Sequence, residues 1–248
     1  MTLSVIIISK NEAHDIEDCL RSVAFADEII VVDSESTDDT CEIARRHTPH
    51  VHTIPWQGFG PQKNHALDLA TGDWVLSLDC DERISDELQH SIIEAIKDPG
   101  AVGFMLRFRT SYCGRFIRFG DWGHERKLRL FRRDAGRFDD AIVHEKILID
   151  GTFDTLKGHV LHYSVRSRDE LRTKSIRYAE LGAEAAFNAG RRATMLTAWG
   201  RGCFAFIRGY LLKGGVLDGR RGLDLAIILA QLTYRKYAEL ARLCRTAR

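Results

Sequence analysis

The stretch Asp73-Trp-Val-Leu-Ser-Leu-Asp79, followed by Cys80-Asp81, decides the fold of this chain. Its short apolar run is typical of a strand that is buried on both faces of a sheet. Ligands of parallel α/β sheets lie beyond the carboxyl ends of the strands, which is where Asp79 and Asp81 stand. Alternate carboxylates of an extended turn can bind one hard cation. The competing interpretation is that both acids cap the next helix or stay hydrated in a loop.

Further strand and helix patterns alternate before this stretch. Strands are predicted at Leu3–Ser9, Glu28–Asp33 and Val51–Ile54. A helix is expected after each strand, with apolar residues at helical spacing after the first and the fourth. We expect Asn11 to be the N-cap of the first helix and Ser85 the N-cap of the helix after the fourth strand. Four strands alternating with helices predict an α/β fold, with a mostly parallel sheet and helices on both faces.

The second half of the chain has a different pattern. From Val102 onward phenylalanine and arginine alternate, and we expect this part to complete the sheet and to build an acceptor side. Ser167-Arg-Asp-Glu170 is a capping box that predicts a helix to about Gly190. From Trp199 onward 10 Lys/Arg stand against 3 acids, interleaved with aromatic and leucine residues. This C-terminal helical segment is therefore expected to be amphipathic and basic.

Composition and charge limit the function classes. The 248 residues are 44% hydrophobic and 29% charged, which is globular composition. Residues 1–100 hold 7 Lys/Arg against 20 Asp/Glu, whereas residues 101–248 hold 29 against 15. An acidic half suits a metal ion and a basic half suits an anionic partner. The basic residues are spread over several predicted elements without a nucleic-acid motif, so we expect no nucleic-acid partner.

Cysteine usage and hydropathy indicate the cellular compartment in which the protein resides. The six cysteines form no C-x-x-C pair, and no basic segment precedes the first apolar run. We therefore expect reduced thiols and a cytoplasmic protein. The longest apolar run free of charge, Leu225–Tyr234, is ten residues, half of the ~20 that cross a bilayer, so no span is expected.

Four motifs resemble the family 2 inverting glycosyltransferases in their order and spacing. They are Val5-Ile-Ile-Ile-Ser-Lys-Asn-Glu12, Ile30-Val-Val-Asp-Ser-Glu-Ser-Thr-Asp-Asp-Thr40, Gln62-Lys-Asn-His-Ala66 and Leu76-Ser-Leu-Asp-Cys-Asp-Glu82. The resemblance covers about residues 3–165 and implies a GT-A fold, which is Rossmann-like. It also implies a nucleotide-sugar donor, here expected to be a UDP-sugar, and a divalent cation, Mg²⁺ or Mn²⁺.

The resemblance carries roles onto matching residues of this chain. Ser9 and Glu12 would border the nucleotide, and Asp33 would contact the base. Lys63 would lie near the base or a phosphate. Asp79 would face the ribose or the metal, and Asp81 would bind the metal. For Glu12 and Asp33 the alternative is a charge that complements a helix macrodipole, and for Lys63 it is a solvated helix face.

An inverting transfer needs a base that takes the proton of the acceptor hydroxyl. Candidates in Arg137-Phe-Asp-Asp-Ala-Ile-Val-His-Glu145 are Asp139, Asp140, His144 and Glu145. Leu128-Arg-Leu-Phe-Arg-Arg133 followed by His144-Glu145 resembles the subgroup that adds sugars to the inner core of lipopolysaccharide. There the His-Glu pair occupies the place of the catalytic acid, which favours Glu145, with Asp140 second. The alternative for Glu145 is an exposed charge beside a strand.

His162 is a candidate for a further ligand of the metal, on the other side of the metal site.

The sequence thus predicts metal-dependent inverting transfer of a hexose from a UDP-sugar to a lipid-linked saccharide, such as the lipopolysaccharide inner core. The nucleotide-sugar half would be 1–100, the acceptor and catalytic half 101–165, and the helical segment 166–248. That segment suits docking to an anionic membrane, on the inner face of the cytoplasmic membrane; a subdomain covering the sheet or an oligomer interface is the other interpretation. Nucleotidyl transfer is disfavoured, because Ser9-Lys-Asn-Glu12 is not a glycine-rich basic loop.

Overall fold

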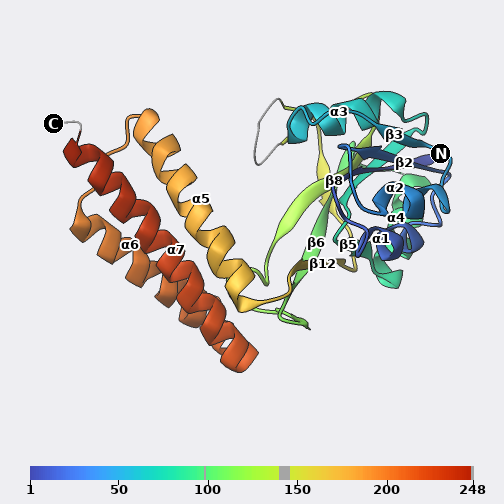
Figure 1. Ribbon diagram of the computed structural model, residues 1–248. Coiled ribbons are helices and arrows are strands. Elements are labelled where there is room, and N and C mark those ends of the chain that lie inside the picture. The colour runs from blue at the N-terminus through green and yellow to red at the C-terminus, as the bar shows by residue number, and fades with distance from the viewer. Residues whose placement is uncertain (98, 140–145, 247–248) are drawn as a thin grey trace. The chain divides into compact units, whose positions relative to one another are not determined.

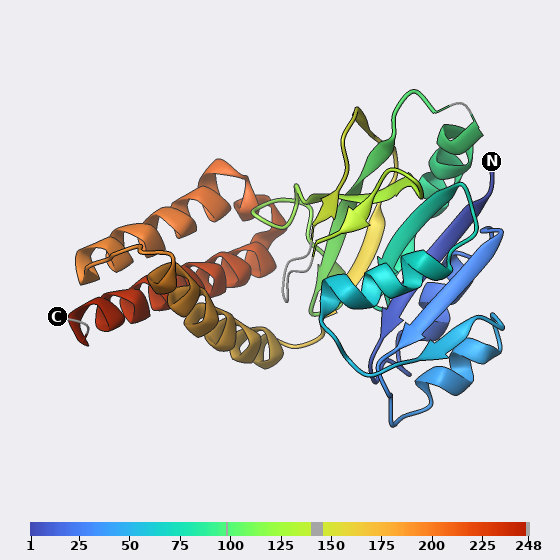
Figure 2. The same ribbon diagram turned by 90° about the horizontal axis from the view of Figure 1, so that it is seen from above.

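The computed structural model describes residues 1–97, 99–139 and 146–246. The chain forms two compact units (Figures 1 and 2). The first consists of Met1–Phe108 and Arg126–His162, and the second of Arg109–Glu125 and Tyr163–Arg248. The first unit contains most of the strands and the polar strand ends that the sequence singles out. The second is mainly helical.

One ten-stranded sheet organises the fold. Its strands are β1 Leu3–Ser9, β2 Glu28–Asp33, β3 Val51–Thr53, β4 Trp74–Asp79, β5 Glu82–Ile84, β6 Gly103–Tyr112, β7 Arg115–Phe116, β8 Arg126–Arg132, β11 Phe153–Thr155 and β12 Val160–Val165. The main order is β3-β2-β1-β4-β8-β6-β12-β5. The four strands from β3 to β4 are parallel, whereas β8 pairs antiparallel with both β4 and β6. A separate pair joins β9 Arg137–Phe138 to β10 Ile147–Leu148.

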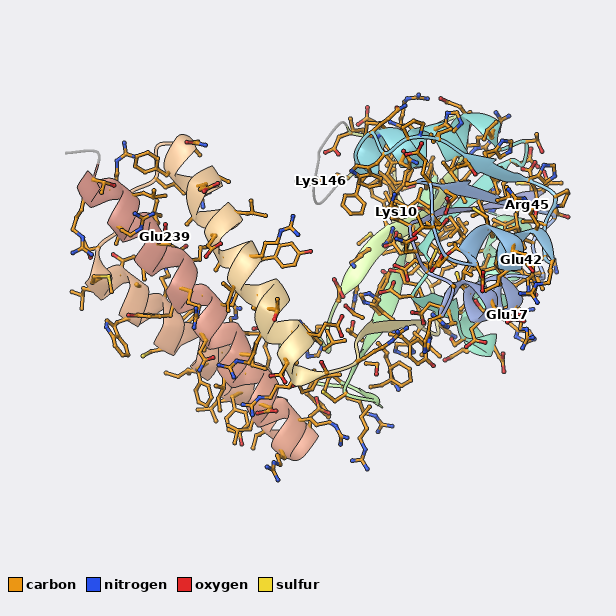
Figure 3. All side chains as sticks on the ribbon, in the orientation of Figure 1. Lys10, Glu17, Glu42, Arg45, Lys146 and Glu239 are labelled. Atoms are coloured by element: carbon orange, nitrogen blue, oxygen red, sulfur yellow. The ribbon has the colours of Figure 1, made fainter. Side chains whose placement is uncertain are left out.

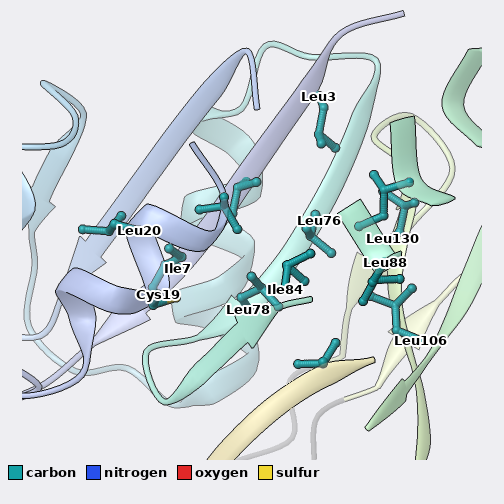
Figure 4. Close-up of a cluster of buried hydrophobic side chains, with 14 of the residues drawn as sticks. Leu3, Ile7, Cys19, Leu20, Leu76, Leu78, Ile84, Leu88, Leu106 and Leu130 are labelled. Carbon is teal, nitrogen blue, oxygen red and sulfur yellow. The ribbon is translucent and has the colours of Figure 1, made fainter. Parts of the chain in front are cut away.

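Helices cover both faces of the sheet, as the alternation of strand and helix patterns predicts. Helices α1 Ile16–Ser22, α2 Thr40–Arg45 and α4 Asp86–Lys97 share one hydrophobic cluster with β1, which contributes Leu3, Val5 and Ile7 (Figure 4). Helix α3 Phe59–Leu69 packs on the other face, in a cluster that contains Ile6. Because neighbouring residues of β1 enter different clusters, the strand is apolar on both faces. The polar side chains of Glu17 and Glu42 lie on the outside of α1 and α2 (Figure 3).

Of the two helix caps predicted within the first hundred residues, one is confirmed and the other is wrong. The Ser85 hydroxyl accepts a hydrogen bond from the Leu88 amide at the start of α4. Asn11, however, does not cap α1, which begins at Ile16 with Asp15 in the N-cap position. Asn11 has a φ of 54° and its side-chain oxygen accepts from the Thr37 amide at 2.8 Å. Its short polar side chain therefore stabilises a left-handed turn between two loops.

The second unit is built on a hairpin and three helices. The helices are α5 Arg168–Asn188, α6 Met195–Ile207 and α7 Gly219–Thr246, with a π-helical turn η1 Arg208–Leu212 and a 3₁₀ turn η2 Gly215–Asp218 between α6 and α7. The predicted capping box is present, because the Ser167 hydroxyl accepts from the Glu170 amide at 3.1 Å. Helix α7 packs against both α5 and α6 (Figure 1). No helix in the described part of the chain has both the length and the apolar character needed to cross a membrane.

Candidate active site

The register of the parallel strands brings the predicted polar residues to one edge of the sheet. Ser9 pairs with Asp33 across β1 and β2, and Ile8 pairs with Asp79 across β1 and β4. The carboxyl ends of three neighbouring strands therefore meet at one level. Ser9, Asp33 and Asp79 thus lie at the same edge of the sheet.

Asp33 forms the centre of the β1–β2 part of this edge. The residue is buried, and its Oδ1 accepts from the hydroxyls of Ser9 at 2.8 Å and Ser36 at 2.6 Å. Its Oδ2 accepts from the Ser36 amide at 2.7 Å. Burial favours the neutral form, but the hydrogen bonds from Ser36 and Ser9 outweigh it and hold the pKa of Asp33 below its ordinary value. Asp33 is thus a fixed, ionised acceptor.

The loops after β1 and β2 are bonded to each other. The Lys10 ammonium donates to the carbonyl of Ser34, and the Glu12 amide donates to the Thr40 hydroxyl at 2.8 Å. The Gln62 side chain of α3 donates to the Ser34 hydroxyl at 2.9 Å. These contacts hold Glu12, one of the predicted nucleotide residues, close to the segment after Asp33. The loops that would border a nucleotide therefore form one connected structure.

Two cations hold Asp79 at the end of β4. Lys63 Nζ of α3 lies 2.9 Å from Asp79 Oδ1, and Arg129 Nη2 of β8 lies 2.8 Å from Asp79 Oδ2. Asp79 keeps 36% of its side chain exposed, whereas the side chains of Lys63 and Arg129 are 1% and 7% exposed. Burial raises the pKa of Asp79, but Arg129 and Lys63 overcome this and shift it well below its ordinary value. Lys63 is therefore a buried partner of Asp79 and not a solvated helix residue.

Arg129 and Glu82 belong to the site although the sequence assigned them no role. The Arg129 guanidinium contacts Glu82 Oε1 at 3.1 Å, and Glu82 Oε2 accepts from the Asp79 amide at 3.0 Å. Burial raises the pKa of Glu82; Arg129 opposes this and the nearby Asp79 adds to it. The signal that could have revealed Arg129 is its place inside Leu128-Arg-Leu-Phe131, because a buried arginine in an apolar strand needs a carboxylate partner.

Replacing Arg129 by methionine is expected to destabilise the protein by about 3–5 kcal/mol, because the change leaves the fully buried carboxylate of Glu82 without its cation and removes one of the two cations of Asp79. Urea unfolding followed by circular dichroism measures the loss. Arg126→Met on the same strand is the control, since that side chain is exposed. A loss below about 1 kcal/mol at Arg129 would contradict the described role, because that is the range of exposed ion pairs.

Asp81 lies beside His162 of β12. Asp81 Oδ2 is 3.3 Å from His162 Nε2, and the two side chains are 30% and 18% exposed. Burial lowers the pKa of His162, but the hydrogen bond and charge of Asp81 outweigh it and raise the pKa above its ordinary value. The structure thus brings together two of the predicted metal residues, whereas the oxygens of Asp79 face Lys63 and Arg129.

A carboxylate and an imidazole at this place fit a divalent cation. In the described residues no three His, Cys, Asp or Glu side chains are arranged to hold a metal ion. Mg²⁺ and similar hard ions commonly take one or two carboxylates and complete their coordination with substrate phosphates and water. Asp81, with His162 beside it, supplies protein ligands of that kind, so the donor set suits a cation shared with a phosphate.

The predicted base lies in a part of the chain that the structure does not cover. Asp140, His144 and Glu145 are outside the described residues, so their roles stay predictions. Asp139 is described, and its carboxylate accepts from the Lys146 amide at 3.0 Å. His159, which neighbours His162 in the sequence, donates its backbone amide to the Ser85 hydroxyl at 3.1 Å.

The chain is similar in sequence to known glycosyltransferases. Residues 4–193 match the family described as "Glycosyl transferase family 2". The chain is 28% identical over 257 residues to the lipopolysaccharide core biosynthesis glycosyltransferase LpsC of Rhizobium meliloti, covering 98% of this chain and 95% of that protein. It is also 28% identical to an uncharacterized glycosyltransferase, RP128, of Rickettsia prowazekii, covering 96% of this chain and 86% of the relative. 

Among solved structures, residues 1–349 of S. aureus TarS bound to UDP align with all of this chain and 92% of that one, at a TM-score of 0.48 and 17% identity. The family match spans most of the chain, including every strand that forms the polar edge. The mixed α/β architecture, with its parallel strands β3 to β4, is the fold class that the sequence patterns predict. The chain belongs to glycosyl transferase family 2 and is a glycosyltransferase.

Proposed function

We propose that this glycosyltransferase moves a hexose from a UDP-sugar, with inversion and with the help of a divalent cation, to a lipid-linked saccharide such as the lipopolysaccharide inner core. The observation that carries the proposal is the polar edge formed by Asp33, Asp79 and Asp81 at neighbouring strand ends. The acceptor class is supported by the name of the Rhizobium meliloti relative, which aligns over nearly its whole length.

Different residues of the polar edge would bind different parts of the sugar-nucleotide donor. Asp33 is an ionised hydrogen-bond acceptor suited to the imide N–H of a uracil. Asp79, held ionised by Lys63 and Arg129, keeps a partly exposed carboxylate that can accept from ribose hydroxyls. Asp81 and His162 would hold the cation. When bound, a Mg²⁺ or Mn²⁺ ion supplies charge stabilisation for the departing diphosphate.

The proton of the acceptor hydroxyl needs a base on the opposite side of the sugar from the departing diphosphate. Glu145 is the proposed base and Asp140 the second candidate, on the strength of the motif that contains them. In the reaction, the acceptor oxygen bonds to the anomeric carbon, the bond from that carbon to the diphosphate breaks, and the hydroxyl proton passes to the carboxylate. The displacement inverts the anomeric configuration.

A donor and product assay tests the proposal. Thermal unfolding with Mn²⁺ is followed for UDP-, GDP-, CMP- and dTDP-sugars, with UDP-glucose as the first hexose. A donor at about 100 times its Kd adds about 2.7 kcal/mol of apparent stability. The transferred sugar is then read from the coupling of its anomeric proton. Preferential stabilisation by another nucleotide class, or retention of configuration, would contradict the proposal.

The second unit is proposed to attach the enzyme to an anionic membrane surface, on the inner face of the cytoplasmic membrane. Large apolar side chains are exposed on α6, η1 and η2, namely Leu196, Trp199, Phe204, Leu211, Leu212 and Leu217. Basic residues adjoin them in the sequence, including Arg220, which is exposed. Exposed apolar groups with basic neighbours suit the interface of an anionic bilayer. Arg208 and Lys213 contribute less than their sequence suggests, because both pair with Asp121, at 2.9 and 2.8 Å.

The double change of Leu211 and Leu212 to serine is expected to weaken binding to phosphatidylglycerol vesicles at least about tenfold, since burying one leucine contributes about 1.5–3 kcal/mol. High salt should weaken wild-type binding without abolishing it, because salt screens only the charges. Vesicle sedimentation measures both. The control is Leu148→Ser, an exposed leucine of the first unit. Equal wild-type binding to phosphatidylcholine vesicles, or binding to neither, would favour a subdomain or oligomer role.

A further inference from the structure

The second unit contains an arginine-lined cavity that the proposed reaction has not used. It measures about 470 Å³ and is lined by Arg109, Arg115, Phe116, Ile117, Arg118, Leu217, Asp218 and Arg221. Four guanidinium groups therefore surround the cavity, against one carboxylate. Arginine stays charged at any physiological pH, so the lining is strongly positive.

A tight hairpin gathers three of these arginines. Strands β6 and β7 pair with Tyr112 opposite Arg115, and the turn residues between them, Cys113 and Gly114, have φ values of 48° and 74°. Positive φ at both positions is the type I′ geometry that closes two-residue hairpins. The Ile117 amide continues the ladder by donating to the Thr110 carbonyl at 2.9 Å. Arg109 and Arg118 flank this last bond in the sequence and both line the cavity, and like charges gathered in one cavity are unfavourable without a counter-ion.

The single carboxylate does not neutralise these arginines. Asp218 accepts hydrogen bonds from the backbone amides of Arg118 and Phe119, at 2.9–3.3 Å, and so is held by main-chain groups. Arg221 donates to the Cys113 carbonyl at 3.4 Å. Within residues 1–97, 99–139 and 146–246, no Asp or Glu lies within ion-pair distance of Arg109, Arg115 or Arg118.

The other segments that line the cavity, which are η2, the start of α7 and Phe116, are held in place by close packing. A Cβ on Gly222 would lie 1.8 Å from the Gly215 carbonyl oxygen, so η2 and the first turn of α7 approach as closely as backbones can. This contact fixes the segment that carries Leu217 and Asp218. On the hairpin side, Phe116 stacks edge-on against Tyr163, with ring centroids 5.3 Å apart. The cavity therefore combines a pre-organised positive lining with an aromatic surface on which a sugar ring can pack.

We infer that this cavity binds a phosphate or carboxylate group of the saccharide acceptor. The inference rests on the proposed function for the identity of the acceptor, but the anion site itself rests only on the cavity. Planar guanidinium groups bind such anions through paired, charge-assisted hydrogen bonds, and an anion relieves the repulsion between Arg109 and Arg118. The chemical class predicted for the acceptor is thus an anionic saccharide.

Binding of inorganic phosphate to the full chain, measured by calorimetry with excess UDP and Mn²⁺ to occupy the donor site, tests the cavity. The double variant Arg109→Gln with Arg118→Gln should weaken phosphate binding about 10- to 100-fold, as expected for lost hydrogen bonds to a charged group. The control, Arg191→Gln with Arg245→Gln, removes the same charge from exposed positions of the same unit. Circular dichroism melting verifies that both variants are folded. No phosphate binding by the wild type, or equal losses in both variants, would overturn the site.

Transfer kinetics then separate the acceptor from other anions. In the double variant the KM for a phosphorylated or carboxylated acceptor should rise at least tenfold, while the affinity for UDP and the slow hydrolysis of the donor stay unchanged. If the variant instead loses binding to phosphatidylglycerol vesicles and keeps its acceptor KM, the ligand is a lipid headgroup and the acceptor assignment is wrong. Phosphate binding that depends on Arg109 and Arg118, without transfer to any lipid-linked saccharide, would overturn the proposed function and leave the anion site standing.

Discussion

Replacing Asp81 by asparagine is expected to lower the rate of sugar transfer about a thousandfold. The change removes a negative ligand for the cation, and charge stabilisation of a departing diphosphate is worth several kcal/mol, of which about 4 corresponds to that factor. Stability should hardly change, because asparagine has the same shape and the Asp81 side chain is partly exposed. Release of UDP and formation of the glycosylated product, measured over a range of Mn²⁺ concentrations, give the rate.

The control for this change is Asp150→Asn, which removes one charge at an exposed position of the same unit. It should keep the wild-type rate. Calorimetry should also show that Mn²⁺ no longer strengthens UDP binding in the Asp81 variant. Full activity of the wild type in EDTA, or of the variant, would remove Asp81 from the metal site and the cation from the mechanism.

The parallel half of the fold follows from local patterns in the sequence. Strands β1, β2 and β4 are apolar runs that end in Ser9, Asp33 and Asp79, and a run of that kind can only be buried in the middle of a sheet. The antiparallel half was predicted only as a continuation of the sheet. In β6 and β8 arginines alternate with apolar residues, which fits an edge strand as well as an inner one. Their pairing depends on contacts far apart in the sequence.

The error at Asn11 has a similar origin. A short polar side chain before a helical pattern is typical of an N-cap, but the same side chain also stabilises left-handed turns. Which of the two occurs is decided by Thr37, which lies on another loop. A cap pattern describes only the local chain, so the start of α1 was misplaced by a few residues.

The sequence indicates which strand ends carry the candidate site, but it does not predict the ion pairs between the residues of the site. The motifs identified Lys63 and Asp79 separately, whereas the structure joins them at 2.9 Å. Lys63 of α3 pairs with Asp79 of β4, which Arg129 of β8 holds through its other oxygen, and no spacing within α3 contains that information. Buried charges need partners. A search for arginines inside apolar strands would therefore have added Arg129 to the candidates.

Replacing Glu145 by glutamine is expected to lower kcat by about 10²–10⁴. Glutamine keeps the size of the side chain and removes its ability to take the acceptor proton, so only the chemical step should suffer. The affinity for UDP should stay at the wild-type value, because donor binding is proposed for Asp33, Asp79 and Asp81 and not for Glu145. Single-turnover rates with saturating donor and acceptor, together with calorimetric UDP binding, separate the two effects.

Asp139 and Asp140 provide the comparison that decides the assignment. Asp139→Asn should have little effect on kcat, because that carboxylate is engaged by the Lys146 amide. If Asp140→Asn shows the large loss and Glu145→Gln does not, the base is Asp140. A loss that shrinks as the pH is raised marks removal of a proton acceptor, because hydroxide then replaces part of the missing base, whereas a loss that stays constant with pH marks a change of shape. The anomeric configuration of the residual product must be inverted in every variant, because the side from which the acceptor attacks does not depend on which carboxylate takes its proton.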